Sequence, residues 1–256
     1  MAIITLTTDF GTSDGYVGAV KGVIARNAET ATIFDIAHDI PRGDIAHAAW
    51  VVSTATREYP HGSIHVVVVD PGVGGARRSV IIKGSGQWYG QWYVGPDNGV
   101  FAYVADARSQ AWQIEARHFR AKRVSPTFHG RDVFAPAAAA LARGEDVLNA
   151  GPTVKLAGTL PWGPREVGHG RVVHVDKFGN LVSDLPAAEA GNAVTFAGRT
   201  LPLVTTYEDV APGQLLAYVG SAGTVEIAVR DGRADTQLEA RRGTPVEPAA
   251  AAVPYR

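Results

Sequence analysis

Residues 63–72 read SIHVVVVDPG, and they are the most informative part of the sequence for the fold class. Its valine run, Val66 to Val69, is β-branched and apolar on both faces that a strand would present. Such a run is typical of a strand buried between two layers of helices. The Asp-Pro-Gly that follows is a turn signal, and it places the carboxylate of Asp70 directly after the strand.

Strand and helix patterns alternate around this stretch. Strands are expected at residues 3–8, 31–36, 79–83, 91–94 and 111–115. Helices are expected at about 16–27, 44–59 and 132–143. Asp44 is a candidate N-cap, and Pro136 falls in a first helical turn, where its missing N–H is tolerated. The pattern predicts an α/β domain over residues 1–155, a layered sheet with helices on both faces.

A second domain is expected after a linker at residues 156–169, which is rich in proline and glycine and has no hydrophobic periodicity. Strand patterns then recur at 170–176, 181–185, 193–197, 214–219 and 224–229. The only helical pattern lies near 234–239, so residues 170–256 are predicted to form a small all-β, barrel-like domain. The Ala- and Pro-rich end, residues 245–256, is expected to be frayed.

Composition excludes several classes of function. The 256 residues are 46% hydrophobic with a formal net charge of -1, which argues against nucleic-acid or anionic-membrane partners. There is no cysteine and no HExxH, so no metal site is predicted. The Gly72-Val73-Gly74-Gly75 run lacks the dinucleotide-binding spacing. No signal peptide or membrane-length apolar run is found, and a cytoplasmic protein is expected.

Three predicted strands end in an acid beside glycine: Asp9, Asp70, and Asp97 with Asn98. In α/β folds ligands bind at the carboxyl ends of the strands, so these side chains are candidate ligand groups. Each motif also suits a plain turn, and that reading stays open. A fourth polar motif, TFHGRD at 127–132, adds His129, which could titrate near neutrality.

The second domain contributes one comparable cluster, DKFGN at residues 176–180. Phe178 could stack on a flat base while Asn180 hydrogen-bonds the edge of that base. An ordinary hairpin turn explains the same residues slightly better. Ser221, between two predicted strands, is a weaker candidate.

Together these motifs resemble the S-adenosylmethionine hydroxide adenosyltransferase family, the S-adenosylmethionine hydrolases, which are related to fluorinase and chlorinase. The motifs that carry the resemblance are TDFG at 8–11, VDPGVG at 69–74, GPDNG at 95–99, TFHGRD at 127–132, DKFGN at 176–180 and SAGTVEIA at 221–228. They occur in order through both predicted domains. The resemblance implies a homotrimer whose substrate sites lie at subunit interfaces.

The resemblance also implies a reaction and its residues. Water or hydroxide attacks the ribose 5′ carbon of S-adenosyl-L-methionine, leaving adenosine and L-methionine, with no metal or other cofactor. The family's catalytic Asp, Arg and His fall on Asp70, Arg77 and His129, although the neighbouring Arg78 is an alternative. The substrate-binding residues that it implies are Asp9 for the ribose; Asp14, Asp176 and Ser221 for methionine; Phe178 and Asn180 for adenine; and Asp97, Asn98 and Phe128.

Two other functions stay open from the sequence. One is transfer of the adenosyl group to a halide, and the other is binding of S-adenosylmethionine or a nucleoside without turnover. Fluorinase-like enzymes carry tyrosine and threonine where this sequence has Asp70 and Val73, and they have an extra loop that is not found here. These departures favour water as the nucleophile.

Overall fold

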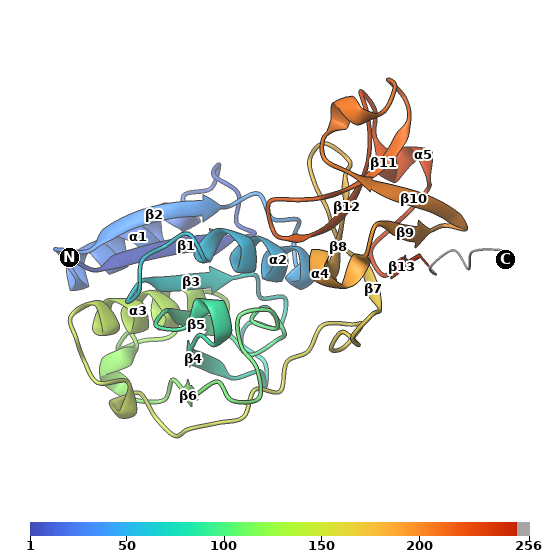
Figure 1. Ribbon diagram of the computed structural model, residues 1–256. Coiled ribbons are helices and arrows are strands. Elements are labelled where there is room, and N and C mark those ends of the chain that lie inside the picture. The colour runs from blue at the N-terminus through green and yellow to red at the C-terminus, as the bar shows by residue number, and fades with distance from the viewer. Residues whose placement is uncertain (250–256) are drawn as a thin grey trace, which may run out of the picture. The chain divides into compact units, whose positions relative to one another are not determined.

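The valine-rich strand β3 (Ile64–Val68) is buried along its whole length in the computed structural model, which describes residues 1–249. It lies in a six-stranded sheet of order β2-β1-β3-β5-β4-β6 (Figure 1). β1, β2, β3 and β5 run parallel, while β4 is antiparallel to both of its neighbours. The other strands are β1 (Ile3–Thr8), β2 (Thr32–Ala37), β4 (Ser79–Lys83), β5 (Trp92–Pro96) and β6 (Ala111–Gln113).

Helices cover both faces of this sheet, as the sequence predicts. Val66 and Val68 share one apolar core with α1 (Tyr16–Asn27) and α3 (Ala135–Ala142). Val67 and Val69 point to the opposite core, which includes side chains of α2 (Ile45–Thr56). Alternate valines therefore bury themselves against different helices, which is why the run needs no polar position.

A capping aspartate and a proline in the first turn mark the starts of two helices. The Asp44 carboxylate accepts a hydrogen bond from the His47 N–H at 3.0 Å, so the predicted N-cap of α2 is confirmed. Pro136 lies in the first turn of α3, as expected, behind a π-helical turn, η3 (Gly130–Phe134). Because Pro136 has no N–H, the Asp132 carbonyl can accept the Ala121 N–H instead, at 2.7 Å. Short 3₁₀ turns are η1 (Gly86–Trp88), η2 (Arg117–Phe119), η4 (Val147–Asn149) and η5 (Tyr207–Asp209).

The chain divides into two units, Met1–Pro161 and Trp162–Arg256. The second unit is a closed barrel of order β10-β11-β12-β8-β7-β13-β9. Its strands are β7 (Gly170–Val175), β8 (Leu181–Pro186), β9 (Ala193–Phe196), β10 (Arg199–Val204), β11 (Leu215–Val219), β12 (Thr224–Val229) and β13 (Pro245–Pro248), with short helices α4 (Ala187–Ala190) and α5 (Ala234–Gln237).

The sequence expectation of fraying is wrong for residues 245–248. They form β13, which pairs with β7 and β9 and so closes the barrel. Val246 is fully buried there, which favours the strand although Pro245 and Pro248 each lack a ladder donor. Residues 250–256 of the expected frayed end lie outside the described part of the chain.

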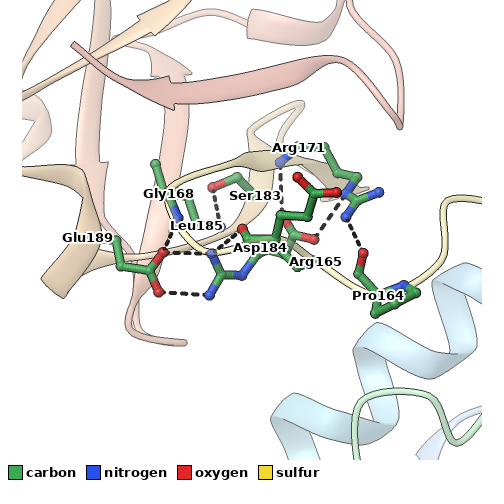
Figure 2. Close-up of polar contacts among 9 residues, drawn as sticks. Pro164, Arg165, Gly168, Arg171, Ser183, Asp184, Leu185 and Glu189 are labelled. Carbon is green, nitrogen blue, oxygen red and sulfur yellow. Dashed lines mark hydrogen bonds and ion pairs between the residues drawn. The ribbon is translucent and has the colours of Figure 1, made fainter. Parts of the chain in front are cut away.

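Charged side chains fix the segment that enters the barrel (Figure 2). The Arg165 guanidinium donates to both oxygens of Glu189 at 2.7 Å, which lowers the pKa of Glu189 to about 2. Arg171 pairs with Asp184 at 3.3 Å and donates to the Pro164 carbonyl at 3.1 Å. Burial raises the pKa of Asp184, a cost that the Arg171 contacts oppose. Residues 164–171 are thereby held against β8 and α4.

Candidate active site

Three neighbouring parallel strands, β1, β3 and β5, bring their carboxyl ends to one edge of the sheet. Asp9 follows β1, Asp70 lies just beyond β3, and Asp97 follows β5. These are the strand-end acids singled out in the sequence, and the topology now explains why they share an edge: their strands are adjacent in the sheet.

Asp70 is held by Arg77. The Arg77 Nε lies 2.9 and 3.0 Å from the two carboxylate oxygens, and Nη2 also contacts Oδ2. Only 4% of the Asp70 side chain and 11% of the Arg77 side chain are exposed. Nη1 donates to Ser79 Oγ at 2.9 Å, and the guanidinium carbon lies 5.5 Å from the centre of the Phe134 ring. These contacts fix the direction in which the carboxylate points.

His129 joins the same guanidinium, because its Nδ1 lies 2.8 Å from Arg77 Nη2. A guanidinium has only donors, so Nδ1 accepts and a neutral imidazole carries its hydrogen on Nε2. Burial and the Arg77 charge lower the pKa of His129, while the Asp70 and Asp132 carboxylates oppose that change. Arg77 therefore binds an anionic and a neutral partner at once.

A glycine allows the loops that carry these residues to meet. Gly74 has φ +75°, and a Cβ there would lie 2.3 Å from the Pro126 carbonyl oxygen. A larger residue would therefore push the loop after β3 away from the segment that leads into His129.

Arg78, the alternative to Arg77, points to a different acid. Its Nε and Nη2 contact Asp97 Oδ2 at 3.1 and 2.6 Å, and Nη2 also donates to the Lys155 carbonyl. Asp97 further accepts the N–H groups of Ala157 and Gly158. The structure thus places Arg77, and not Arg78, against Asp70 and His129.

Two other predicted site residues of the first unit, Asp9 and Asn98, form hydrogen bonds with backbone groups. Asp9 accepts the Gly43 N–H at 2.8 Å. Asn98 donates to the Val69 carbonyl at 2.9 Å, directly before Asp70. Asp14 is exposed in the turn before α1. Their roles in substrate binding stay predictions.

Phe128, next to His129, belongs to a group of aromatic rings. Its ring centre lies 5.9 Å from that of Phe10 and 5.4 Å from that of Tyr16. Arg131 lies 4.8 Å over the same ring. The group packs the loop after β1 against the segment that precedes η3.

The predicted cluster of the second unit forms the turn between β7 and β8. The Asp176 carboxylate accepts the N–H groups of Phe178 and Asn180 at 2.9 and 2.8 Å, and the Asn180 Nδ2 at 2.8 Å. Phe178 projects with 68% of its surface exposed. The hairpin-turn interpretation therefore describes the backbone, and an exposed aromatic ring with a fixed amide remains available to a ligand. Ser221 is exposed in the turn between β11 and β12.

The sequence analysis missed Ser79 and Phe134, both of which contact Arg77. Ser79 could have been found, because it lies two residues after Arg77 at the start of a predicted strand and so faces the same side. Phe134 had no such signal, since its contact depends on how η3 packs.

Within residues 1–249, no cluster of three or more His, Cys, Asp or Glu side chains is arranged to hold a metal ion. The same residues include no helix that is long and apolar enough to cross a membrane.

The state of His129 predicts a pH dependence. A lowered pKa means that the imidazole stays neutral below its ordinary value of about 6.5, where an unperturbed histidine would already be half charged. We therefore expect the NMR titration midpoint of His129 to lie below about pH 6.5, assigned by the loss of its signal in His129→Gln. A midpoint at or above that value would contradict the Arg77 contact.

Comparisons with known proteins agree in both units. Residues 4–151 match the SAM hydroxide adenosyltransferase N-terminal domain, and residues 170–247 match the C-terminal domain of the same name. The chain is 40% identical to the (R)-S-adenosyl-L-methionine hydrolase of Thermus thermophilus, with 96% of this chain and 99% of that protein covered.

Two further matches also cover most of the chain. A fluorinase of Actinopolyspora mzabensis is 23% identical, with 88% of this chain and 90% of that protein covered. The crystal structure of an uncharacterized conserved protein from Thermotoga maritima superposes with a TM-score of 0.83 at 32% identity, covering 96% of this chain and 98% of that one. From both family domains and the relatives matched over nearly the whole length, the chain belongs to the SAM hydroxide adenosyltransferase family.

Proposed function

We propose that the protein hydrolyses S-adenosyl-L-methionine to adenosine and L-methionine, without a metal or other cofactor. The observation that carries the proposal is the contact of one arginine, Arg77, with both Asp70 and His129 at the carboxyl edge of the sheet. Relatives that are about 40% identical bear the name (R)-S-adenosyl-L-methionine hydrolase, which supports the same activity.

The reaction needs help mainly with its nucleophile. A sulfonium leaves as a neutral thioether, so the departing methionine requires no proton. Water is a weak nucleophile, and it must be held in line with the breaking C5′–S bond while it loses a proton. The oxygen of water forms the new bond to C5′, the C5′–S electron pair goes to sulfur, and one proton leaves the water.

The contacts of Arg77 favour Asp70 as the acceptor of that proton. His129 Nδ1 is already bound to Arg77, so its Nε2–H acts as a donor that can hold the oxygen of water. The Asp70 carboxylate is an acceptor whose direction Arg77 fixes. General-base catalysis of this kind supplies on the order of 10²–10⁴-fold, and positioning adds to it.

Substrate contacts are proposed as the family resemblance implies. Asp9 binds the ribose; Asp14, Asp176 and Ser221 bind the methionine part; and Phe178 and Asn180 hold adenine. The fixed Asn180 amide and the exposed Phe178 ring support the adenine assignment.

We also propose that the protein is a cytoplasmic homotrimer with its sites at subunit interfaces. Light scattering should then give about three times the chain mass of 27.0 kDa.

Product analysis tests the proposed activity. Purified protein is incubated with S-adenosyl-L-methionine in chloride-free buffer, and again with added chloride or fluoride, and the products are separated by chromatography. Equimolar adenosine and methionine, unaffected by halide, are expected. A 5′-halo-nucleoside would move the protein to halide transfer, and tightly bound but unchanged ligand would identify a binding protein instead.

A further inference from the structure

A chain of hydrogen bonds runs from Asn180 through two tyrosine hydroxyls to the carboxylate of Glu226. Asn180 Nδ2 donates to the Tyr207 hydroxyl at 3.0 Å, and this hydroxyl lies 2.8 Å from that of Tyr218. The Tyr218 hydroxyl in turn donates to Glu226 Oε2 at 2.5 Å. Tyr218 and Glu226 are cross-strand partners in β11 and β12. All four residues belong to the barrel unit.

Counting hydrogens gives this chain of hydrogen bonds a direction. Tyr218 has one hydroxyl hydrogen, and it is donated to Glu226. Tyr218 can therefore only accept from Tyr207, so the single hydrogen of Tyr207 is also used. Tyr207 must then accept from its remaining neighbour, and only the NH₂ group of Asn180 can donate there.

Asp176 imposes the same orientation from the other side. Its Oδ2 lies 2.8 Å from Asn180 Nδ2, so the amide nitrogen faces two acceptors, a carboxylate and a tyrosine hydroxyl. Turning the amide over would set its oxygen against both of them, which is repulsive. Because both Nδ2 hydrogens are committed, a ligand can meet this amide only through Oδ1.

The Glu226 carboxylate lies in a polar position within a mostly apolar strand, next to a glycine. Glu226 is an acid within a strand whose neighbours Val225 and Ile227 are fully buried. A Cβ on Gly220 would lie 1.9 Å from Glu226 Oε1, so a larger residue there would displace the carboxylate from this position.

We propose that Glu226, acting through Tyr218 and Tyr207, is a positioning residue that presents the Asn180 oxygen to the substrate base and so selects a 6-amino purine over a 6-oxo purine. The inference rests on the proposed function, in which Asn180 meets adenine. Adenine offers an N6 amino donor to such an oxygen, whereas hypoxanthine offers a carbonyl oxygen. Two acceptors face to face lose a hydrogen bond and repel, which is how a fixed polar group rejects the wrong ligand.

The test compares two substrates, S-adenosyl-L-methionine and its hypoxanthine analogue S-inosyl-L-methionine, in the full-length protein. Burial raises the pKa of the Glu226 carboxyl, so the assays are run at about pH 8. The wild type is expected to favour the amino substrate in kcat/KM by about tenfold or more. Tyr207→Phe, and Glu226→Leu, which leaves the Tyr218 hydroxyl without its acceptor, are expected to reduce that ratio by about tenfold. Tyr207→Phe frees an Nδ2 hydrogen for the 6-oxo group, and Tyr207 is partly exposed, so the change leaves the barrel core intact.

The ratio of kcat/KM for the two substrates shows whether Glu226 and Tyr207 position Asn180 or only stabilise the barrel. Tyr89→Phe, at an exposed tyrosine of the other unit, is the matched control and should keep the wild-type ratio. If both variants lower kcat/KM equally for the two substrates, or keep the full ratio, the inference is wrong. The dissociation constants of adenosine and inosine give a ratio of binding affinities that needs no turnover. A wild type that cleaves neither substrate refutes the proposed function, but its preference for adenosine over inosine still tests the inference.

Discussion

Asp70→Asn is expected to reduce adenosine formation by about 10²–10⁴-fold while S-adenosyl-L-methionine still binds. The asparagine oxygen can keep one contact with Arg77, so the loop should hold its place, but a neutral amide cannot accept the proton of water. Turnover is followed by chromatography of adenosine and methionine, and binding by calorimetry.

The same aspartate-to-asparagine substitution at a surface position serves as the control for Asp70→Asn. Asp106→Asn alters an exposed acid that pairs with Arg108 on the surface, and it should retain wild-type turnover. If Asp70→Asn turned over at the wild-type rate, Asp70 would not be the proton acceptor.

The second large effect separates two adjacent arginines. Arg77→Lys should lower kcat by about 10²-fold, because one ammonium cannot reach Asp70, His129 and Ser79 together as the planar guanidinium does. Arg78→Lys should leave kcat within about threefold and instead lower the thermal midpoint, because Arg78 ties Asp97 to the Lys155 carbonyl.

The two lysine variants are each other's control, since the substitution is the same and the positions are neighbours. Steady-state kinetics and thermal melts on both decide the assignment. A loss of kcat in Arg78→Lys with wild-type kinetics in Arg77→Lys would reverse the roles given to the two residues.

Much of the first unit can be predicted from local patterns. The valine run of β3 needs two covering layers, and it has them. Acids after β1, β3 and β5 share an edge because these strands are parallel and adjacent. The valine run and the acids that end the strands are features of short stretches of sequence, so periodicity and turn residues were enough to predict them, whereas the order of the strands is set by the tertiary fold.

The choice between Arg77 and Arg78 could not be predicted in this way. Neighbouring residues at a strand entrance point to opposite sides, and which side faces Asp70 depends on the pairing of β4 with β5, where Ser79 lies opposite Pro96. β13 was not predicted for a similar reason. Its two prolines weaken the strand pattern, and Val246 is buried in a core only because the barrel closes.

The contacts around Asn180 depend on tertiary structure in the same sense. Tyr207 lies on a 3₁₀ turn, η5, and Tyr218 and Glu226 lie on β11 and β12, so no spacing in the sequence links them to the turn after β7. One signal was present, an acid in the middle of the apolar pattern TVEIAV of β12. A charged residue at such a position indicates a polar partner.

Oxygen-isotope labelling shows whether water is the group that attacks C5′. The purified protein is allowed to hydrolyse S-adenosyl-L-methionine in water enriched in oxygen-18, and the adenosine is analysed by mass spectrometry. Attack of water on C5′ predicts one labelled oxygen, located at the 5′ position of the ribose, and unlabelled methionine. Adenosine without the label, or a 5′-substituted nucleoside in its place, would contradict the account.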